Sequence, residues 1–435
     1  MNKIHFIGIG GIGLSALARF LNHKGYIVSG SDIKDTHITN ELRNEGIRVD
    51  VPHNSINITN QDYIIYSAAI KKDNIEYKRA KQLGLTVLSR KEALKIILKN
   101  KKVYAVAGAH GKSTTSAILA SLVDGSMIIG AESNQFSSNM HYCDSQNLVF
   151  EADESDESFL NSNPYMAIVT NCEPEHMDFY NHDIKRFYSA YERFLKIAKV
   201  RVINAEDEFL GSLDIDAIKL YPSKDIKNIG YILENNKPYT IFNLKDFGKF
   251  KVIGLGDHVA LDASLVILAA LYEGMSKDEI RFKIKNYQGI KKRFDILVSG
   301  DRGAIVDDYA HHPTEIEATL KSAKKYASLM GYKSVKAIWQ PHKYSRVIDN
   351  IEKFKTCFQE ANELTILPVW SAGETKVDID FGEIFKSYKP VFADRVKRED
   401  DKLKLIKDNH CINTLKQELI IGFGAGDLTY QLRGK

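Results

Sequence analysis

Cysteine is scarce in this sequence and is never paired. The four cysteines among its 435 residues, Cys143, Cys172, Cys357 and Cys411, stand far apart and form no CxxC motif. This spacing indicates neither a zinc site nor a disulfide framework. The sequence also lacks an apolar run long enough to span a bilayer and the layout of a signal peptide. We therefore expect a reducing, cytoplasmic protein that has no membrane partner.

A strong excess of either charge is also missing. Lysine and arginine total 60 and the acids total 56, which leaves a formal net charge of +4. An excess this small, spread over a long chain, argues against a nucleic-acid partner. We interpret the charged run from Lys397 to Lys404 as a solvated loop or helix face. With 44% hydrophobic residues and no repeat, the composition is that of an ordinary globular protein with several cores.

The pattern along the chain is strand, glycine turn and helix, repeated. It predicts an α/β fold with parallel sheets. Apolar runs at residues 4–9 and 103–107 each end at a glycine loop that is followed by a helix, and residues 297–309 read as two strands that open a further unit. Residues 208–256 show only weak periodicity. We predict three domains, covering residues 1–100, 101–292 and 293–435.

The first glycine loop, Gly8 to Gly13, has the spacing G-x-G-x-x-G between a strand and a helix. Glycines at this spacing let the backbone approach a pyrophosphate that sits on the amides of the helix N-terminus. Asp32 ends the next strand, where a dinucleotide site would place an acid on a ribose. Alone, the motif suits an NAD or FAD enzyme, or tight strand–helix packing without a ligand. A UDP-sugar also carries a pyrophosphate.

A second glycine loop, Gly108 to Thr115, also joins a strand to a helix. Lys112 can reach the β- and γ-phosphates of a nucleotide, and the hydroxyl of Ser113 or Thr114 can ligate Mg²⁺. The loop is shorter than a standard P-loop, because Val106 stands where the first glycine is expected. The backbone amides that can cradle phosphate oxygens are those of Gly108, Ala109, His110 and Gly111. Two phosphate loops imply two nucleotides, and a simple dehydrogenase does not need the second.

Two acidic runs follow consecutive strands of the central part. Residues 151–156 read EADESD, and residues 171–178 read NCEPEHMD. Because ligands bind at the carboxyl ends of parallel strands, and Mg²⁺ prefers oxygen ligands, we interpret these runs as a metal site beside Lys112. Glu151 is the expected ligand, and His176 a candidate ligand to a second cation. An isolated run of this kind would more readily be a solvated acidic loop.

The last third carries histidine, tyrosine and arginine side chains after two further strands. Residues 307–312 precede Pro313, which stands at the position that proline prefers in a helix, and residues 339–346 follow the next strand. Cations suit a carboxylate, and a neutral imidazole can hold or deprotonate an amine. We therefore predict a small zwitterionic ligand at this sheet edge. The side chains that converge there are those of Tyr309, His311, His342 and Arg346.

In this order the segments resemble the Mur ligases over nearly the whole chain. The motifs that carry the resemblance are HFIGIGGIGLSALA, GAHGKSTT, FEADESDESFL, TNCEPEHMD, DDYAHHPTEI, WQPHKYSR, SAGE and GAGD. The resemblance implies a Rossmann-like N-terminal domain for a UDP-sugar, a central P-loop ATPase domain and a Rossmann-like C-terminal domain for an amino acid. The sequence is most similar to the members that join L-alanine to UDP-N-acetylmuramate, with ATP and Mg²⁺, through an acyl phosphate in peptidoglycan precursor synthesis.

The resemblance also implies a role for individual residues. In the first domain, the residues at the UDP pyrophosphate, the uridine and the sugar would be Gly10, Gly11, Gly13, Asp32 and Ser67. In the central domain, those at ATP and the two Mg²⁺ ions would be Lys112, Ser113, Thr114, Glu151 and His176. Arg293 would reach the γ-phosphate, and Asp308 would touch the ATP ribose. The residues around L-alanine would be Tyr309, His311, His342 and Arg346.

The chain departs from the family pattern at several positions. Lys343 stands where arginine is usual, which removes a bidentate fork but keeps the charge. Val259 and Asp262 replace two asparagines, so the family's adenine contacts are not carried over. Several relatives bridge their metals with a carbamylated lysine, and the matching position before Asn204 is Tyr191, which cannot form a carbamate. We predict that the second Mg²⁺ rests on His176, substrate oxygens and water.

Three other functions remain open on sequence grounds. A recycling ligase that adds a whole peptide to UDP-N-acetylmuramate would share the sugar and ATP sites but would need a larger pocket in the last domain. An NAD-dependent oxidoreductase built on the first glycine loop leaves the second loop and the carboxylates unexplained. A nucleotide-binding module without catalysis leaves the metal ligands beside Lys112 unexplained.

Overall fold

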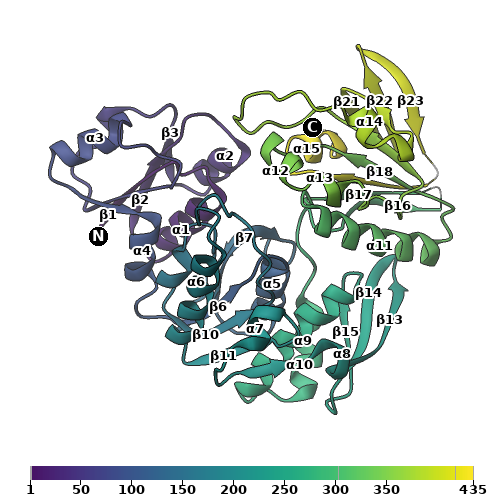
Figure 1. Ribbon diagram of the computed structural model, residues 1–435. Helices are drawn as coiled ribbons and strands as arrows, with labels where there is room; N and C mark the ends of the chain where they lie inside the picture. Colours follow the sequence, from purple (N-terminus) through teal and green to yellow (C-terminus); the bar gives the residue numbers. More distant parts are fainter. Residues whose placement is uncertain (1, 302, 417, 435) are drawn as a thin grey trace. The chain divides into compact units, whose positions relative to one another are not determined.

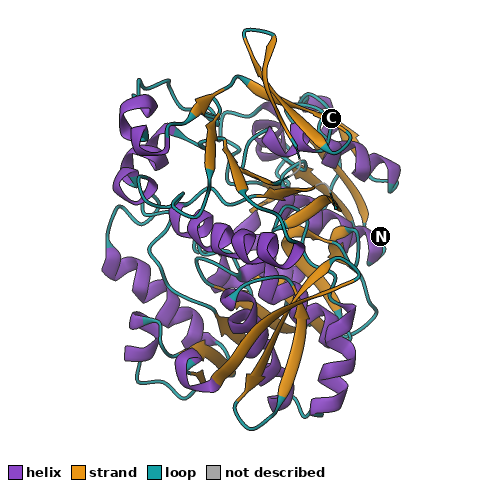
Figure 2. Ribbon diagram, turned by 90° about the vertical axis from the view of Figure 1, so that its right-hand side faces the viewer, coloured by secondary structure: helices purple, strands orange, loops and turns teal. Residues whose placement is uncertain are grey.

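A computed structural model describes residues 2–301, 303–416 and 418–434. Contacts divide the chain into two compact units. The first consists of Met1–Ile226 and Leu261–Gln288, and the second of Lys227–Ala260 and Gly289–Lys435. Both units contain helices and strands (Figure 2). Among the described residues, no helix is both long and apolar enough to cross a bilayer.

The first unit begins with a parallel sheet of five strands in the order β3-β2-β1-β4-β5 (Figure 1). Its strands are β1 (Lys3–Ile7), β2 (Ile27–Ser31), β3 (Arg48–Asp50), β4 (Tyr63–Tyr66) and β5 (Thr86–Ser89). Its helices are α1 (Ile12–His23), α2 (His37–Asn44), α3 (Ile75–Gln82) and α4 (Arg90–Ile97). The strand, glycine loop and helix predicted at the start of the chain are present. The strand ends two residues early because the glycine turn already begins at Gly8.

A second sheet of the same unit has seven strands in the order β12-β11-β10-β6-β9-β7-β8. Its strands are β6 (Lys102–Ala107), β7 (Ser126–Ser133), β8 (Ser138–His141), β9 (Asn147–Glu151), β10 (Pro164–Val169), β11 (Val200–Asn204) and β12 (Ile218–Leu220). Its helices are α5 (Lys112–Leu122), α6 (Ile184–Ile197), α7 (Glu208–Ser212), α8 (Pro222–Asp225) and α10 (Lys277–Lys283). Strands β10, β6 and β9 are neighbours and parallel, so the loops that follow them meet at one sheet edge.

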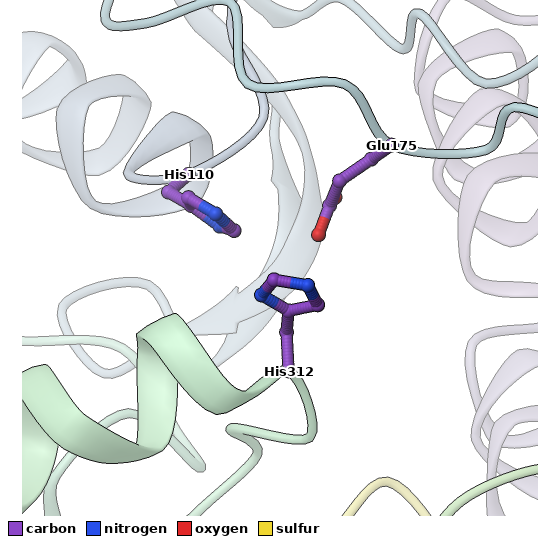
Figure 3. Close-up of side chains that lie close together, drawn as sticks. All are labelled: His110, Glu175 and His312. Carbon is purple, nitrogen blue, oxygen red and sulfur yellow. The ribbon is translucent and has the colours of Figure 1, made fainter. Parts of the chain in front are cut away.

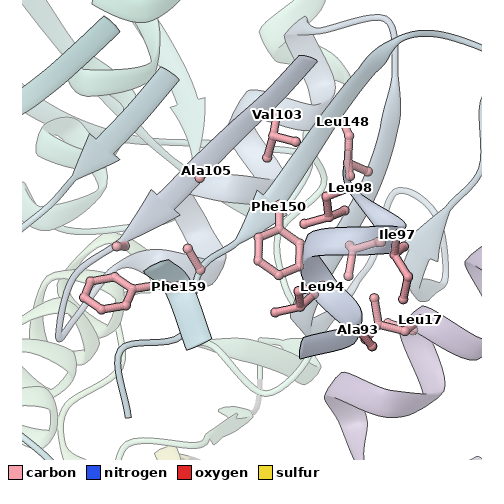
Figure 4. Packing of buried hydrophobic residues seen from close by; sticks show 14 of the residues in the cluster. Leu17, Ala93, Leu94, Ile97, Leu98, Val103, Ala105, Leu148, Phe150 and Phe159 are labelled. Carbon is pink, nitrogen blue, oxygen red and sulfur yellow. The ribbon is translucent and has the colours of Figure 1, made fainter. Parts of the chain in front are cut away.

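The two sheets of the first unit share one apolar core. Helix α4 contributes Leu94 and Ile97, which lie in one buried cluster with Leu17 of α1 and Phe150 of β9 (Figure 4). Phe159, which follows the acidic run, is also fully buried in this cluster. Because the core is continuous, α4 joins the first sheet to the loops of the second.

The second unit contains a six-stranded sheet in the order β16-β17-β24-β18-β19-β20. Its strands are β16 (Asp295–Gly300), β17 (Gly303–Asp308), β18 (Val335–Trp339), β19 (Glu363–Ile366), β20 (Val391–Phe392) and β24 (Leu419–Phe423). Its helices are α11 (Pro313–Met330), α12 (Tyr344–Asp349), α13 (Ile351–Phe354), α14 (Phe381–Ile384) and α15 (Leu428–Leu432). Strands β17, β24 and β18 run parallel side by side, while β16 is antiparallel to β17. The two strands predicted at residues 297–309 and the helix start at Pro313 are confirmed.

Two small antiparallel sheets escaped the sequence analysis. Strands β13 (Ile226–Glu234), β14 (Lys237–Leu244) and β15 (Lys249–Ile253) occupy the segment without clear periodicity, and α9 (Asp257–Tyr272) follows them. Strands β21 (Arg395–Glu399), β22 (Lys402–Lys407) and β23 (His410–Leu415) form the other sheet. The interpretation of residues 397–404 as a solvated loop or helix face is therefore wrong. Buried Val396, Leu403 and Leu405 alternate with the lysines there, so one face of the hairpin packs inward.

Candidate active site

The loop between β6 and α5 is shaped by two glycines. Gly108 and Gly111 have φ angles of 139° and 81°, which favour glycine. A methyl carbon on Gly108 would lie 2.1 Å from Oγ1 of Thr170, and one on Gly111 would lie 2.5 Å from Oδ1 of Asp262. Asn171 fixes the loop from the neighbouring strand, since its side chain accepts from the amide of residue 110 at 3.1 Å and donates to that residue's carbonyl at 2.9 Å. Asn171 thus fixes the path of the loop that leads into the N-terminus of α5.

Lys112 is the first residue of α5, and its ammonium group is paired with a buried carboxylate. Its Nζ donates to Oε1 of Glu154 at 3.0 Å and to the carbonyl oxygens of Gly108 and Ala109. Burial raises the pKa of the fully buried Glu154 to about 7, although the ammonium group acts in the opposite direction. Burial would lower the pKa of Lys112, but Glu154 and Glu151 outweigh it and raise that pKa. The loop therefore presents a charged lysine to any phosphate that it binds.

A compact set of possible metal ligands lies beside this lysine. Ligand atoms of Glu154, Glu175 and His176 all lie within 4.8 Å of one another. His176 has a φ of 55°, an uncommon backbone angle for a residue other than glycine. His110 approaches the same carboxylate of Glu175 to within 4.8 Å (Figure 3). Its Nε2 also lies 2.9 Å from Oε2 of Glu173. Two carboxylates and an imidazole suit a divalent cation, and oxygen ligands of this kind suit Mg²⁺.

The other predicted metal ligands occupy the same sheet edge. Glu151 is the last residue of β9, and its carboxylate accepts from the amide of Gly130 at 2.9 Å. Ser113 and Thr114 form the first turn of α5, next to Lys112. Within the described part of the chain, Glu151 is not a member of the three-residue set around His176. Glu154 and Glu175 are members of this set, and the sequence alone did not identify them as metal ligands. Their run held too many carboxylates for spacing alone to select among them.

The first glycine loop lies at the carboxyl ends of β1 and β2. The amides of Gly8 and Ile9 donate to the carbonyl of Ser31 at 2.9 and 3.0 Å, and the amide of Gly10 donates to Oδ2 of Asp32 at 2.8 Å. Ser67 follows β4, and its hydroxyl oxygen is the atom that a methyl carbon on Gly8 would approach most closely, at 2.9 Å. The structure thus brings Asp32 and Ser67 to the loop, as the sequence predicts. Helix α1 begins within the motif, at Ile12, with Gly11 as its N-cap.

In the second unit, Asp308 and Arg293 organise the end of β17. The carboxylate of Asp308 accepts from the amides of Phe294 and Ala310 at 2.7 and 2.8 Å. Burial raises the pKa of Asp308 to about 6 despite the nearby Arg293. The guanidinium of Arg293 pairs with Glu315 at 3.1 Å and lies over the ring of Tyr309. Burial acts against its charge, but Glu315 and Asp308 raise the pKa of Arg293, so it stays cationic.

The loops after β17 and β18 bring the predicted amino-acid-binding side chains together. The ring of His311 lies 5.4 Å from that of Tyr309 and 5.7 Å from that of His342. Burial lowers the pKa of both histidines, to about 4 for His342, where His311 and Arg346 add to the effect. Both imidazoles are therefore neutral near pH 7.

Hydrogen bonds determine which ring nitrogen carries the proton in each of these two neutral imidazoles. Nη1 of Arg346 donates to Nδ1 of His342 at 3.0 Å, which leaves Nε2 of His342 as a donor. Nδ1 of His311 lies 3.0 Å from the carbonyl of Tyr309 and donates to it, which leaves its Nε2 as an acceptor. The cluster thus combines a cation, a hydrogen-bond donor and a proton acceptor. This combination suits a ligand that carries both a carboxylate and an amine.

Family models match most of the chain's first two sheets. The model described as the Mur ligase family, catalytic domain, matches residues 3–102, and the Mur ligase middle domain matches residues 106–253. The chain belongs to the Mur ligase family, whose members are ATP-dependent and generally use Mg²⁺.

Two sequence relatives and one solved structure are similar to this chain over nearly its whole length. A UDP-N-acetylmuramate–L-alanine ligase from Campylobacter curvus is 55% identical over 434 residues, covering 100% of both chains. The enzyme of the same name from Helicobacter pylori is 53% identical over 436 residues, covering 100% of this chain and 96% of its own. Among solved structures, a UDP-N-acetylmuramate–alanine ligase from Thermotoga maritima matches with a TM-score of 0.82 at 26% identity, covering 100% of this chain and 98% of that one. The α/β fold expected of a Mur ligase is thereby confirmed.

Proposed function

We propose that this chain joins L-alanine to UDP-N-acetylmuramate at the expense of ATP, in peptidoglycan precursor synthesis. The observation that carries the proposal is the second phosphate loop, in which Lys112 stands beside Glu154, Glu175 and His176. A dehydrogenase or a passive nucleotide-binding module has no use for this arrangement. The names of the full-length relatives supply the two substrates. The function predicted from the sequence agrees with both.

The two glycine loops of the first unit would bind the two nucleotides. Residues 1–100 would hold the UDP-sugar, with its pyrophosphate on the amides around Gly10 to Gly13 and its uridine and sugar near Asp32 and Ser67. Residues 101–292 would hold ATP on the loop 108–114. Lys112 would exchange its carbonyl partners for the β- and γ-phosphates of ATP.

Mg²⁺ fits the carboxylates and imidazole at this edge of the sheet. Glu151 and the hydroxyl of Ser113 would hold one ion, and His176 the other, with Glu154 and Glu175 as the further oxygen ligands that the structure adds. When bound, Mg²⁺ neutralises charge between the substrate carboxylate and the triphosphate, which otherwise repel.

Residues 293–435 would bind L-alanine. The guanidinium of Arg346 would pair with the alanine carboxylate, and Tyr309 would line the pocket. Nε2 of His311, which is free to accept, would take the hydrogen bond of the alanine amine. Arg293 would supply positive charge to the γ-phosphate, and Asp308 would contact the ATP ribose.

The reaction would proceed in two displacements. A carboxylate oxygen of the sugar nucleotide attacks the γ-phosphorus, the bond to ADP breaks, and an acyl phosphate forms. The alanine nitrogen then attacks the acyl carbon, the carbon–oxygen bond to phosphate breaks, and the amine loses a proton as the amide forms. ATP is needed because an amine cannot displace oxide from a carboxylate. The reaction requires that its three substrates be brought together and water kept from the acyl phosphate.

The test is release of phosphate from ATP in the presence of Mg²⁺ and defined substrates. We expect release only when both UDP-N-acetylmuramate and L-alanine are added, and a product heavier than the sugar nucleotide by one alanyl group. Release with a peptide but not with L-alanine would identify a recycling ligase instead. Reduction of NAD by the protein would contradict the ligase proposal altogether.

A further inference from the structure

The loop that carries His342 has an unfavourable backbone conformation at its last residue. Lys343 joins His342 to helix α12, and its φ and ψ angles are 67° and 134°. Such angles are rare for a residue with a side chain, and they persist only where the surroundings hold them. Arg346 lies in the first turn of α12, and its Nη1 contacts Nδ1 of His342 at 3.0 Å. The conformation of Lys343 therefore determines how these two side chains meet.

The segment after β19 restrains the backbone on one side of Lys343. This segment, residues 370–374, is here called the SAGE loop, after a motif that the proposed function does not use. The amide of Lys343 donates to the carbonyl of Trp370 at 2.9 Å, and the amide of Trp370 donates to the carbonyl of Pro341 at 2.8 Å. These bonds continue the parallel pairing of β18 and β19 as far as a bridge between His342 and Trp370.

A second unused motif, GAGD at residues 424–427, packs against the same place. A methyl carbon on Gly426 would lie 2.8 Å from Cγ of Trp370 and would also meet the side chain of Gln340. Nε2 of Gln340 donates to Oδ1 of Asp427 at 2.6 Å. Because Gly426 has no side chain, Trp370 packs directly on the loop after β24, which holds the start of the SAGE loop in place.

Helix α12 has no cap of its own and takes one from the SAGE loop. The N-cap residue, Lys343, makes no side-chain capping bond. Instead, the carboxylate of Glu374 accepts from the amide of Ser345 at 3.1 Å and from its hydroxyl at 2.6 Å. Burial raises the pKa of Glu374, but the hydrogen bonds from Ser345 outweigh it and hold that pKa below its usual value. Glu374 is therefore a carboxylate at neutral pH, which suits the N-terminus of a helix.

We propose that Glu374 is a positioning residue for L-alanine. By capping α12, it holds Lys343 in its unfavourable conformation. Without the cap, the backbone at Lys343 relaxes and α12 carries Arg346 away from His342. The fraction of the enzyme that can bind the amino acid then falls, and the apparent affinity falls with it. This inference rests on the proposed function, because it takes L-alanine as the ligand of these side chains.

The experiment measures phosphate release while L-alanine, ATP and UDP-N-acetylmuramate are varied in turn. Glu374→Ala should raise the KM for L-alanine by about 5- to 30-fold, which corresponds to about 1–2 kcal/mol for the lost capping bonds. The value of kcat at saturating L-alanine and the other two KM values should stay within about twofold, as expected when only binding of one substrate is affected. A fall in kcat with all three KM values changed alike would show a general structural role and overturn the inference.

Glu374→Gln tests whether the capping bonds are responsible. The glutamine amide can accept from the amide of Ser345 and donate to its hydroxyl, so this variant should recover most of the affinity for L-alanine. Ser345→Ala removes only the hydroxyl bond and should raise the KM for L-alanine by about three- to tenfold. It carries the test if circular dichroism shows that Glu374→Ala does not fold. If Glu374→Gln is as impaired as Glu374→Ala, the charge and not the cap is responsible, and the inference is wrong.

Asp380→Ala is the matched control. Asp380 accepts from the amide of Glu383 at 3.0 Å and so caps α14, another short helix of the second unit. Its loss should lower the Tm about as Glu374→Ala does but leave the KM for L-alanine unchanged. An equal rise in this KM would assign the effect to lost stability and contradict the inference. If the unmodified protein shows no phosphate release that depends on L-alanine, the proposed function fails. If it does, and Glu374→Ala and Ser345→Ala match it, only this inference fails.

Discussion

Replacing Lys112 by methionine should end catalysis and change how stability depends on pH. Lys112→Met keeps most of the side chain's volume but removes the ammonium group that we propose to contact the β- and γ-phosphates of ATP. Cationic groups that complete a phosphoryl-transfer site contribute about 10³- to 10⁵-fold in rate. We therefore expect a loss of phosphate release of at least ~10³-fold, or about 4 kcal/mol of transition-state stabilisation. The affinity for UDP-N-acetylmuramate should persist, because its loop lies on the other sheet of the unit.

The stability effect follows from Glu154, whose pKa in the folded protein is about 7. The ordinary pKa of a glutamate is about 4.5, so between pH 4.5 and pH 7 Glu154 holds its proton in the folded protein but loses it in the unfolded chain. The free energy of unfolding therefore falls as the pH rises through this range, and Glu154 causes no further loss above pH 7. Lys112→Met removes the cation beside Glu154 and so raises the pKa of Glu154 further. The variant should then continue to lose stability above pH 7, by up to about 1.4 kcal/mol per pH unit.

Thermal unfolding at pH 6, 7.5 and 9, followed by circular dichroism, measures this difference. Circular dichroism is preferred because both tryptophans, Trp339 and Trp370, lie in the second unit, whereas Lys112 lies in the first. The Tm gap between variant and unmodified protein should widen from pH 7.5 to pH 9, at about 2–4 °C per kcal/mol. Adding Glu154→Gln to the variant should close the gap and leave the enzyme inactive. Near-normal turnover of Lys112→Met would refute the ATP assignment, and a gap independent of pH would refute the role of Glu154.

Three further predictions concern the rest of the site. Glu151→Ala should raise the Mg²⁺ needed for half-maximal activity more than His176→Ala does, and identical Mg²⁺ titrations for both variants and the unmodified enzyme would count against two metal sites. Arg346→Gln should raise the KM for L-alanine by about 10- to 100-fold. It should also move the acid limb of kcat/KM to higher pH, because the cation that helps to lower the pKa of His342 is gone. Because Tyr191 replaces the carbamylated lysine, bicarbonate depletion should leave activity unchanged, and a carbamate mass on any central lysine would show otherwise.

The sequence predicted those parts of the fold that depend on short, local residue patterns. Apolar runs that end in glycine located β1 and β6, because a parallel strand buried on both faces reads as an unbroken hydrophobic stretch. Pro313 marked the start of α11 for a similarly local reason. The strands of residues 226–253 were missed because polar and apolar residues do not alternate cleanly in them, since β14 buries Thr240 and leaves Ile241 partly exposed. Strand β13 also carries four polar or glycine positions among its nine residues, and they follow no regular alternation.

The same distinction holds for the site. Tyr309, His311, His342 and Arg346 could be placed together from the sequence, because they follow two parallel strands whose carboxyl ends lie at the same edge of one sheet. Among the acidic residues no such rule applied. All of 151–156 follow one strand, and only the turn of the backbone decides which carboxylate faces Lys112.

Arg90 and Glu154 show what sequence patterns alone leave out. Each is an ordinary charged residue in its own segment, one at a helix start and one in an acidic run, and neither belongs to a glycine motif. Their importance arises from packing: the core that Leu94 and Phe159 share draws α4 onto the loop after β9. That packing places the guanidinium between Gly13 and Asp153. Glu154, the residue after Asp153, contacts Lys112 of the second loop, so Arg90 and the acidic run together connect the two glycine loops. The two loops were recognisable separately from the sequence, but a physical connection between them required the tertiary structure.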